Sequence, residues 1–402
     1  MHRTVLQPEF DAALARLGDG TPGAAEYQDL TTLVLDHPTT RSLAVLDPFG
    51  AEYQEAVLDL YARLRSRPGD ASYVPERDEA AQSDGRLPAD LWTGLVPWSL
   101  RSPALTAEFL LAWGQIFRLL DVAPGQSVLE YGPGSGQVLL MLARMGVRAC
   151  GVDIDGSAIA AIRAQADALG LPVELERQVF GEGFGAERFD AILFFEAFHH
   201  ALAFPALLAR LRDRLKPGGR LVLCGEPVVD APNSSIPYPW GPRLDALSVY
   251  CMRRWGWMEL GFTRPFLTEA AARAGWELAH HPFPDCGRAC AFVLTPTAGD
   301  TAPELPGGMP AAESPSETEG VIAHLHARAD RLERELEACR ASTSWRVTAP
   351  LRAAGSVRGA VAGLLSARRK RQPATLPEPP PAQPVPPSAP PGAPPPSPSP
   401  PP

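Results

Sequence analysis

Glycines and acids near residue 130 have the types and spacing needed to bind a nucleotide-like ligand. The stretch VLEYGPGSGQ places Glu130 two residues before three alternating glycines, at positions 132, 134 and 136. Glycines between an apolar run and a helical pattern let the backbone approach a bound nucleotide closely. A dinucleotide site requires G-x-G-x-x-G, but the third position here is Gln137. An acid at position 130 would also repel a pyrophosphate, so the loop favours a positively charged ligand.

Further acids and two histidines follow the predicted strands. Asp153 comes 21 residues after the first glycine, and a carboxylate there can accept both hydroxyls of a ribose. The nearby Asp155 is the better helix N-cap, which leaves Asp153 free for this role. His199 and His200 directly follow the fourth predicted strand, where a histidine can act as a general base. We expect one of them to be the base. Glu226, at the end of the fifth predicted strand, is the next candidate.

These residues need a scaffold, and from residue 105 the chain alternates between strand and helix patterns. Such alternation predicts a doubly wound α/β fold, a parallel sheet with helices on both faces and ligands at the carboxyl ends of the strands. After it, residues 266–296 predict a last helix and a final antiparallel strand pair. KPGG at 216–219 is expected to stop the fourth helix. The predicted strands are 127–131, 149–154, 173–179, 189–198 and 220–226, and the helices are 109–120, 136–146, 156–170 and 204–215.

The pattern E-x-G-x-G-x-G at 130–136 resembles the first motif of class I S-adenosylmethionine-dependent methyltransferases. FDAILFFEAFHH and LKPGGRLVL resemble the fourth strand of that family and its turn into the fifth. The resemblance covers roughly residues 105–297 and implies a Rossmann-like fold with S-adenosylmethionine as the cofactor. Its register after the third strand leaves the adenine contacts open, with Glu182 as one candidate. The residues that we expect at the cofactor are Glu130, Tyr131, Gly132, Gly134, Gly136, Asp153, Ile154 and Glu196, of which Glu196 could instead orient a histidine.

An aromatic insert, residues 227–264, separates the fifth strand from the last helix. Tyr238, Trp240 and Arg243 combine aromatic faces with hydrogen-bonding groups, which suits a sugar ring. The alternative is a capping subdomain whose aromatics form a small core of their own. Residues 1–104 contain helical patterns and are expected to pack over the active site and help to bind substrate.

The C-terminal quarter of the sequence predicts segments for dimerisation and membrane binding rather than for catalysis. Residues 298–319 have the composition of a linker, and 320–342 carry a short heptad pattern for a coiled-coil homodimer or, alternatively, a single solvated helix. Residues 343–372 form a basic amphipathic segment, of which 345–371 can lie on an anionic membrane surface. Residues 373–402 are rich in proline and are expected to be disordered.

Within the basic segment, SWRVTAPLR at 344–352 resembles a stretch near the ends of bacterial glycosyltransferases and methyltransferases that build surface polysaccharides. That resemblance implies a glycan or a sugar-containing precursor as the substrate. It also makes a glycosyltransferase a candidate protein partner, especially if the segment docks on protein rather than on a membrane.

Composition excludes several other classes. The net charge of −9 argues against a nucleic-acid binder. Cys286 and Cys290 form a C-x3-C pair without a second pair, so we expect reduced thiols and no zinc, and more generally no metal. The N-terminus lacks the apolar core of a signal peptide, and no run of 18 apolar residues occurs, which predicts a cytoplasmic protein that does not span a membrane.

The sequence therefore predicts a cytoplasmic methyltransferase that acts on a glycan, binds no metal and lies peripherally on the inner face of the membrane. Two alternatives stay open. One is a scaffold with a methyltransferase fold that recruits polysaccharide enzymes without catalysing a reaction. The other is a methyltransferase for a small natural product or a lipid.

Overall fold

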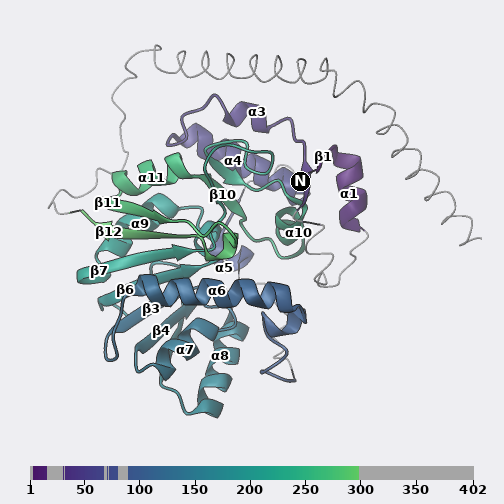
Figure 1. The fold of residues 1–402 in the computed structure, drawn as a ribbon. Helices are drawn as coiled ribbons and strands as arrows, with labels where there is room; N and C mark the ends of the chain where they lie inside the picture. Colours follow the sequence, from purple (N-terminus) through teal and green to yellow (C-terminus); the bar gives the residue numbers. More distant parts are fainter. Residues whose placement is uncertain are drawn as a thin grey trace, which may run out of the picture. The chain divides into compact units, whose positions relative to one another are not determined.

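The computed structural model describes residues 3–15, 30, 32–67, 70, 72–79 and 89–297 (Figure 1). The predicted linker, coiled coil, basic segment and proline-rich tail lie outside the described residues, so the membrane and dimer contacts stay predictions. None of the described helices is long and apolar enough to cross a membrane.

A seven-stranded sheet in the order β11-β12-β7-β6-β3-β4-β5 forms the centre of the fold (Figure 1). The five strands from β5 to β7 pair in parallel, whereas β12 is antiparallel to both of its neighbours. This arrangement confirms the predicted doubly wound sheet with a final antiparallel strand. The strands are β3 Ser127–Tyr131, β4 Arg148–Asp153, β5 Val173–Arg177, β6 Phe189–Phe195, β7 Leu215–Cys224, β11 Trp276–His281 and β12 Ala291–Pro296.

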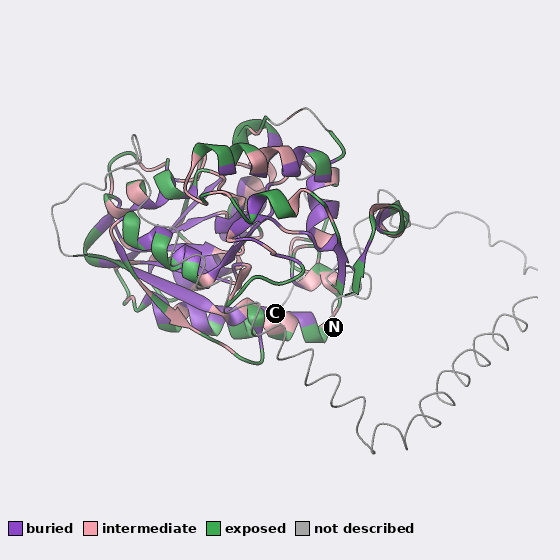
Figure 2. Ribbon diagram, turned by 90° about the horizontal axis from the view of Figure 1, so that it is seen from above, coloured by how far each residue is buried: buried purple, intermediate pink, exposed green. Residues whose placement is uncertain are grey.

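Alternating side chains bury both faces of this sheet, and Figure 2 shows its strands as mostly buried. Val128 faces one apolar cluster, together with side chains from α6, α7 and α8, while Leu129 faces the other, with side chains from α9 and α11. Period-two alternation in a strand with two covered faces produces this division. The helices are α6 Pro103–Leu120, α7 Gln137–Arg144, α8 Gly156–Leu169, α9 Phe204–Arg212 and α11 Arg264–Arg273, with a short 3-10 helix η3 Gly287–Ala289 between β11 and β12.

KPGG does not form the turn that the sequence predicted. Helix α9 already ends at Arg212, and residues 216–219 belong to strand β7. The pairing of β7 with β6 shifts register between Phe189 and Ala191, where Gly218 has a φ of 79°. A Cβ on Gly219 would lie 2.9 Å from the carbonyl oxygen of Asp190, so glycine permits this close approach.

The N-terminal region and the insert pack together beside the main sheet. Within the insert, β8 Val228–Val229, β10 Leu260–Thr263 and β9 Trp240–Pro242 form a three-stranded sheet. The hydroxyl of Tyr53 donates to the carbonyl of Trp240 at 2.6 Å, and the amide of Leu35 donates to the carbonyl of Leu244 at 2.9 Å. The other elements here are β1 Arg3–Val5, α1 Gln7–Ala15, β2 Leu33–Leu35, α3 Thr40–Leu43, α4 Ala51–Leu64, α5 Pro75–Asp78, η1 Trp98–Leu100, η2 Phe198–His200 and α10 Ala246–Arg254.

Candidate active site

A cavity of about 950 Å³ opens at the carboxyl ends of strands β3, β4 and β6. This volume is typical of a site that encloses a small molecule. Residues 132–135 after β3 and 153–155 at the end of β4 line one part of it, and residues 94–96 and Trp257 line another. The N-terminal region and the insert therefore both contribute to the wall.

The three glycines of the loop have different structural roles. Gly132 and Gly134 have φ values of 68° and 51° and line the cavity, and a Cβ on Gly132 would meet the Cβ of Ala197 at 2.8 Å. Gly136, with φ of 72°, does not line it among the described residues. A Cβ there would lie 2.5 Å from Ile162, so this glycine lets α7 pack against α8. Of the three predicted glycines, the first two therefore line the cavity.

Glu130 is a buried acid that borders the cavity. Glu130 is 2% exposed, and its Oε2 atom has no hydrogen-bond partner among the described residues. Burial, together with the nearby charge of Asp153, raises the pKa of Glu130 to about 8. A carboxylate held in this way gains strongly from a cationic ligand, because a positive charge offsets its loss of hydration.

Asp153 lies at the end of β4 and also borders the cavity. Burial raises its pKa to about 6, although backbone N–H groups oppose the shift: Asp155 donates to Oδ1 at 2.8 Å and Gly134 to Oδ2 at 3.3 Å. The side chain of Asp155 instead accepts from the amide of Ser157 and caps α8, as predicted. Ile154 lines the cavity beside it.

Two side chains that were predicted to serve the cofactor point elsewhere. Tyr131 is fully buried, does not line the cavity in the described part of the chain, and donates its hydroxyl to the carbonyl of Glu182 at 3.1 Å. The carboxylate of Glu182 pairs with Arg210 at 2.9 Å instead of facing the cavity. Val179 and Phe180 line this part of the wall. The sequence signal that was overlooked is the apolar pair Val179–Phe180, which follows β5 after Gln178.

Glu196 follows β6 in a left-handed conformation, with φ of 51°, and borders the cavity. Its carboxylate is paired with the guanidinium of Arg288, from η3. That guanidinium also lies 4.1 Å from the centre of the Phe109 ring. The charge of Glu196 is therefore already compensated within the protein, unlike that of Glu130.

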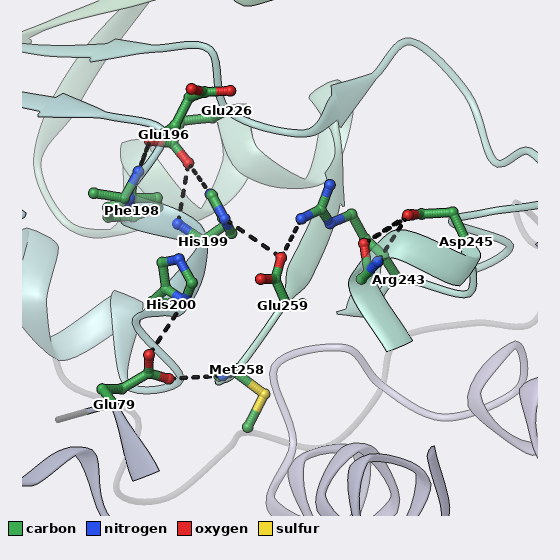
Figure 3. Close-up of polar contacts among 12 residues, drawn as sticks. Glu79, Glu196, Phe198, His199, His200, Glu226, Arg243, Asp245, Met258 and Glu259 are labelled. Carbon is green, nitrogen blue, oxygen red and sulfur yellow. Dashed lines mark hydrogen bonds and ion pairs between the residues drawn. The ribbon is translucent and has the colours of Figure 1, made fainter. Parts of the chain in front are cut away.

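The two histidines occupy different positions, as Figure 3 shows. His199 is buried behind the cavity wall, and its Nδ1 lies 2.8 Å from Oε2 of Glu226. Burial, and then the neighbouring charge of His200, lower the pKa of His199 well below its ordinary value. His199 is thus a neutral imidazole that donates its Nδ1 proton to Glu226.

Glu226 orders the turn that carries both histidines. Its carboxylate accepts the backbone N–H groups of Ala197, Phe198 and His199 at 3.0 Å each (Figure 3). It does not border the cavity in the described part of the chain. Donors occupy both of its carboxylate oxygens, and the residue lies behind the cavity wall. Glu226 is therefore not placed to serve as the alternative base.

His200 borders the cavity and has an acidic partner that the sequence did not reveal. Its Nδ1 lies 3.3 Å from the carboxylate of Glu79, which also accepts the amide of Met258 at 2.6 Å (Figure 3). The same carboxylate accepts the Tyr73 hydroxyl at 2.7 Å. Burial lowers the pKa of His200, but the carboxylates, with Glu79 first among them, outweigh burial and raise it to about 9. The ring of Trp257 lies edge-on, 5.7 Å away.

The three predicted substrate residues of the insert do not line the cavity among the described residues. Tyr238 and Trp240 are 1% and 4% exposed, and Trp240 donates its ring N–H to the carbonyl of Pro48 at 2.8 Å. Arg243 forms an ion pair with Glu259. The alternative, a capping role without substrate contact, fits these residues better, but they form no core of their own: Trp240 packs against Tyr53, Phe204 and Phe266, all outside the insert. Trp257 is the aromatic residue of the insert that reaches the cavity.

The family model described as "Methyltransferase domain" matches residues 98–281. Among curated proteins, the chain is 34% identical over 173 residues to a protein-L-isoaspartate O-methyltransferase of Methylorubrum extorquens, covering 42% of this chain and 65% of the relative. The corresponding protein of Methylorubrum populi is 33% identical over 173 residues, with 42% and 70% covered. A ubiquinone biosynthesis O-methyltransferase of Paramagnetospirillum magneticum is 30% identical over 120 residues, with 30% and 48% covered.

The chain thus spans less than two thirds of the length of the first relatives that it matches, 65% and 48%. Among solved structures, it resembles the CcbJ methyltransferase from Streptomyces caelestis, with 20% identity, a TM-score of 0.37, and 49% of this chain and 98% of that chain covered. A similarity with so low a TM-score gives no information about function. The family match, the relative covered over 70% of its length and the seven-stranded sheet agree with one another. The chain belongs to the class I S-adenosylmethionine-dependent methyltransferases.

Proposed function

We propose that this chain transfers a methyl group from S-adenosylmethionine to a hydroxyl group of a glycan or a sugar-containing precursor. The observation that carries the proposal is one cavity bordered both by Glu130, a buried acid with an unpaired oxygen, and by the His200–Glu79 pair. The first suits a cationic cofactor, and the second suits an acceptor that must lose a proton.

The residues present fit the cofactor. Oε2 of Glu130, which has no hydrogen-bond partner in the described part of the chain, can accept the cationic amino group, and Asp153 can accept the ribose hydroxyls. No described atom lies within 4 Å of the Cβ direction of Gly134. When bound, S-adenosylmethionine supplies a methyl carbon that is activated by its positive sulfonium. The chain then has to align the acceptor and to accept its proton.

His200 is the group in this cavity that is placed to accept the proton. As a neutral imidazole it has one free lone pair, and the carboxylate of Glu79 stabilises the imidazolium that forms. A second positive charge in the cavity lowers the pKa of His200 from about 9 toward neutrality, which favours the form that can act as a base. Glu226 and His199 keep the turn that carries His200 rigid.

An oxygen acceptor is supported by the relatives, several of which are named O-methyltransferases. A glycan is supported by the segment at 344–352 and by Trp257, whose apolar ring could contact the C–H face of a sugar. A second candidate, an apolar natural product or a lipid, is favoured by one observation. Leu95, Val96 and Phe109 also line the cavity.

Mass spectrometry of surface polysaccharide, from cells with and without the protein, tests the proposal. We expect the polysaccharide to lack one methyl group per modified sugar when the protein is absent, and to regain it with wild type but not with His200→Ala. Identical polysaccharides together with a missing methyl group in the lipid fraction would support the second candidate. No methylation difference in any fraction would favour a scaffold that does not catalyse methyl transfer.

A further inference from the structure

Two buried side chains converge on His200 from behind the cavity wall. His199, His200 and Glu259 each present one ligand atom, and these three atoms lie within 4.8 Å of one another. Two imidazoles and a carboxylate form a donor set that suits Zn²⁺ and related ions. We propose that these three side chains form a binding site for a divalent transition-metal ion, and that a metal bound there stops His200 from acting as a base.

Each of the three ligands is held by a further group. Glu226 lies 2.8 Å from Nδ1 of His199, Glu79 lies 3.3 Å from Nδ1 of His200, and Arg243 pairs with Glu259 (Figure 3). Metal-binding histidines usually donate their second ring N–H to a carboxylate, which fixes the lone pair on the nitrogen that binds the metal. His199 therefore has the supporting hydrogen bond of a metal ligand, whereas Nδ1 of His200 faces Glu79 without a hydrogen bond among the described residues.

The contact between His199 and Glu259 also calls for a cation. Because Nδ1 of His199 donates to Glu226, Nε2 carries the lone pair. This Nε2 lies 3.6 Å from Oε2 of Glu259, so two acceptor atoms face each other, and the same Oε2 also accepts from the guanidinium of Arg243. Around the three ligands, the carboxylates of Glu79, Glu226 and Glu259 are opposed by the guanidinium of Arg243 and, while it is protonated, by the imidazolium of His200, which leaves a net negative charge. A divalent cation would compensate the remaining negative charge.

The position of the cluster decides what the metal would do. His200 lines the cavity, whereas His199 and Glu259 do not line it among the described residues. The ligand set therefore lies mainly behind the wall, away from a bound acceptor. A neutral imidazole has one free lone pair, so a His200 that binds a metal cannot accept a proton. This consequence rests on the proposed function, in which His200 is the base.

Calorimetric titration of the full chain with ZnCl₂ tests the site. We expect wild type to bind one more Zn²⁺ per chain than Glu259→Gln, or to bind it at least about tenfold more tightly. His280→Ala is the matched control. It removes an imidazole that lies 3.2 Å from Cys290 outside the cluster, and it should retain the site. Equal binding by wild type and Glu259→Gln would overturn the proposal.

Crystals of the wild-type protein grown with ZnCl₂ provide a test that does not depend on a variant. Anomalous scattering should show a peak within about 2.0–2.2 Å of the three ligand atoms. Zinc peaks only at other side chains would contradict the site.

A turnover assay tests the consequence, with an acceptor that the methylation experiment identifies. Saturating ZnCl₂ should reduce turnover by about 10²-fold or more, the usual contribution of a general base, and EDTA should restore it. Unchanged or increased turnover with Zn²⁺ bound would refute inhibition through His200. If no acceptor is methylated at all, the proposed function fails, while the titration and the crystals still decide the metal site.

Discussion

Cofactor affinity should depend steeply on pH because Glu130 is mostly protonated in the empty protein. Its pKa of about 8 leaves roughly a tenth of the molecules ionised at pH 7, and roughly a hundredth at pH 6. A cationic amino group pairs with the ionised carboxylate, so binding must release the proton. The sign follows directly: affinity is lost as the pH falls below 8, and it recovers as the pH rises.

The expected magnitude is about a tenfold gain in S-adenosylmethionine affinity between pH 6 and pH 7, equivalent to about 1.4 kcal/mol. Ionisation of Asp153, with a pKa of about 6, should add less than a further factor of about two over this range. Isothermal titration in buffers of different ionisation enthalpy should also show that nearly one proton is released per cofactor at pH 7.

Two controls make this prediction specific. Glu130→Gln should bind the cofactor more weakly at pH 8, by about 1.5–3 kcal/mol, and should lose most of the pH dependence. Methylthioadenosine, which lacks the amino group and the sulfonium, should bind wild type with little dependence on pH. A flat profile for S-adenosylmethionine in wild type, or the same slope in Glu130→Gln, would refute the role that we assign to Glu130.

The remaining predictions concern other parts of the chain. Asp153→Ala should weaken cofactor binding by about 1.5–3 kcal/mol in the same titration, and unchanged affinity would remove Asp153 from the cofactor site. Glu79→Gln should move the acidic limb of the pH–kcat/KM profile, measured in EDTA, to lower pH, because the charge that raises the pKa of His200 is lost; an unmoved limb would contradict their coupling. Gly136→Ala should destabilise the fold by about 1–3 kcal/mol in urea, because its φ is positive and Ile162 blocks the Cβ, whereas Gly134→Ala should lose less, since its Cβ direction is open. The full chain should co-sediment with anionic vesicles in low salt, whereas a truncation after residue 318 should not; equal partitioning would favour a protein partner for residues 345–371.

Local patterns were sufficient to predict the sheet and the residues after β3 and β4 that line the cavity. The glycine loop, Asp153 and the cap at Asp155 lie within one strand–helix unit each, so their spacing along the chain determines their spacing in the fold. KPGG was the local failure. Glycines that usually end a helix here allow strand β7 to begin early and to approach Asp190.

The acceptor side could not be predicted in the same way. Glu79 meets His200 only because the N-terminal region packs on the insert, a contact without a signature in the sequence. Tyr238 and Trp240 were assigned to substrate because aromatic and polar residues alternate there, but a small aromatic core has the same composition. The choice between the two histidines likewise depended on which of them borders the cavity.

The most direct test of the central claim is a methyl-transfer assay with radiolabelled S-adenosylmethionine and an identified acceptor, comparing wild type, Glu130→Gln and His200→Ala. We predict that wild type labels the acceptor, that Glu130→Gln mainly raises the KM for the cofactor, and that His200→Ala lowers kcat by about 10²–10⁴-fold with little change in cofactor affinity. Near-normal kcat in His200→Ala, or an unchanged cofactor KM in Glu130→Gln, would contradict the account.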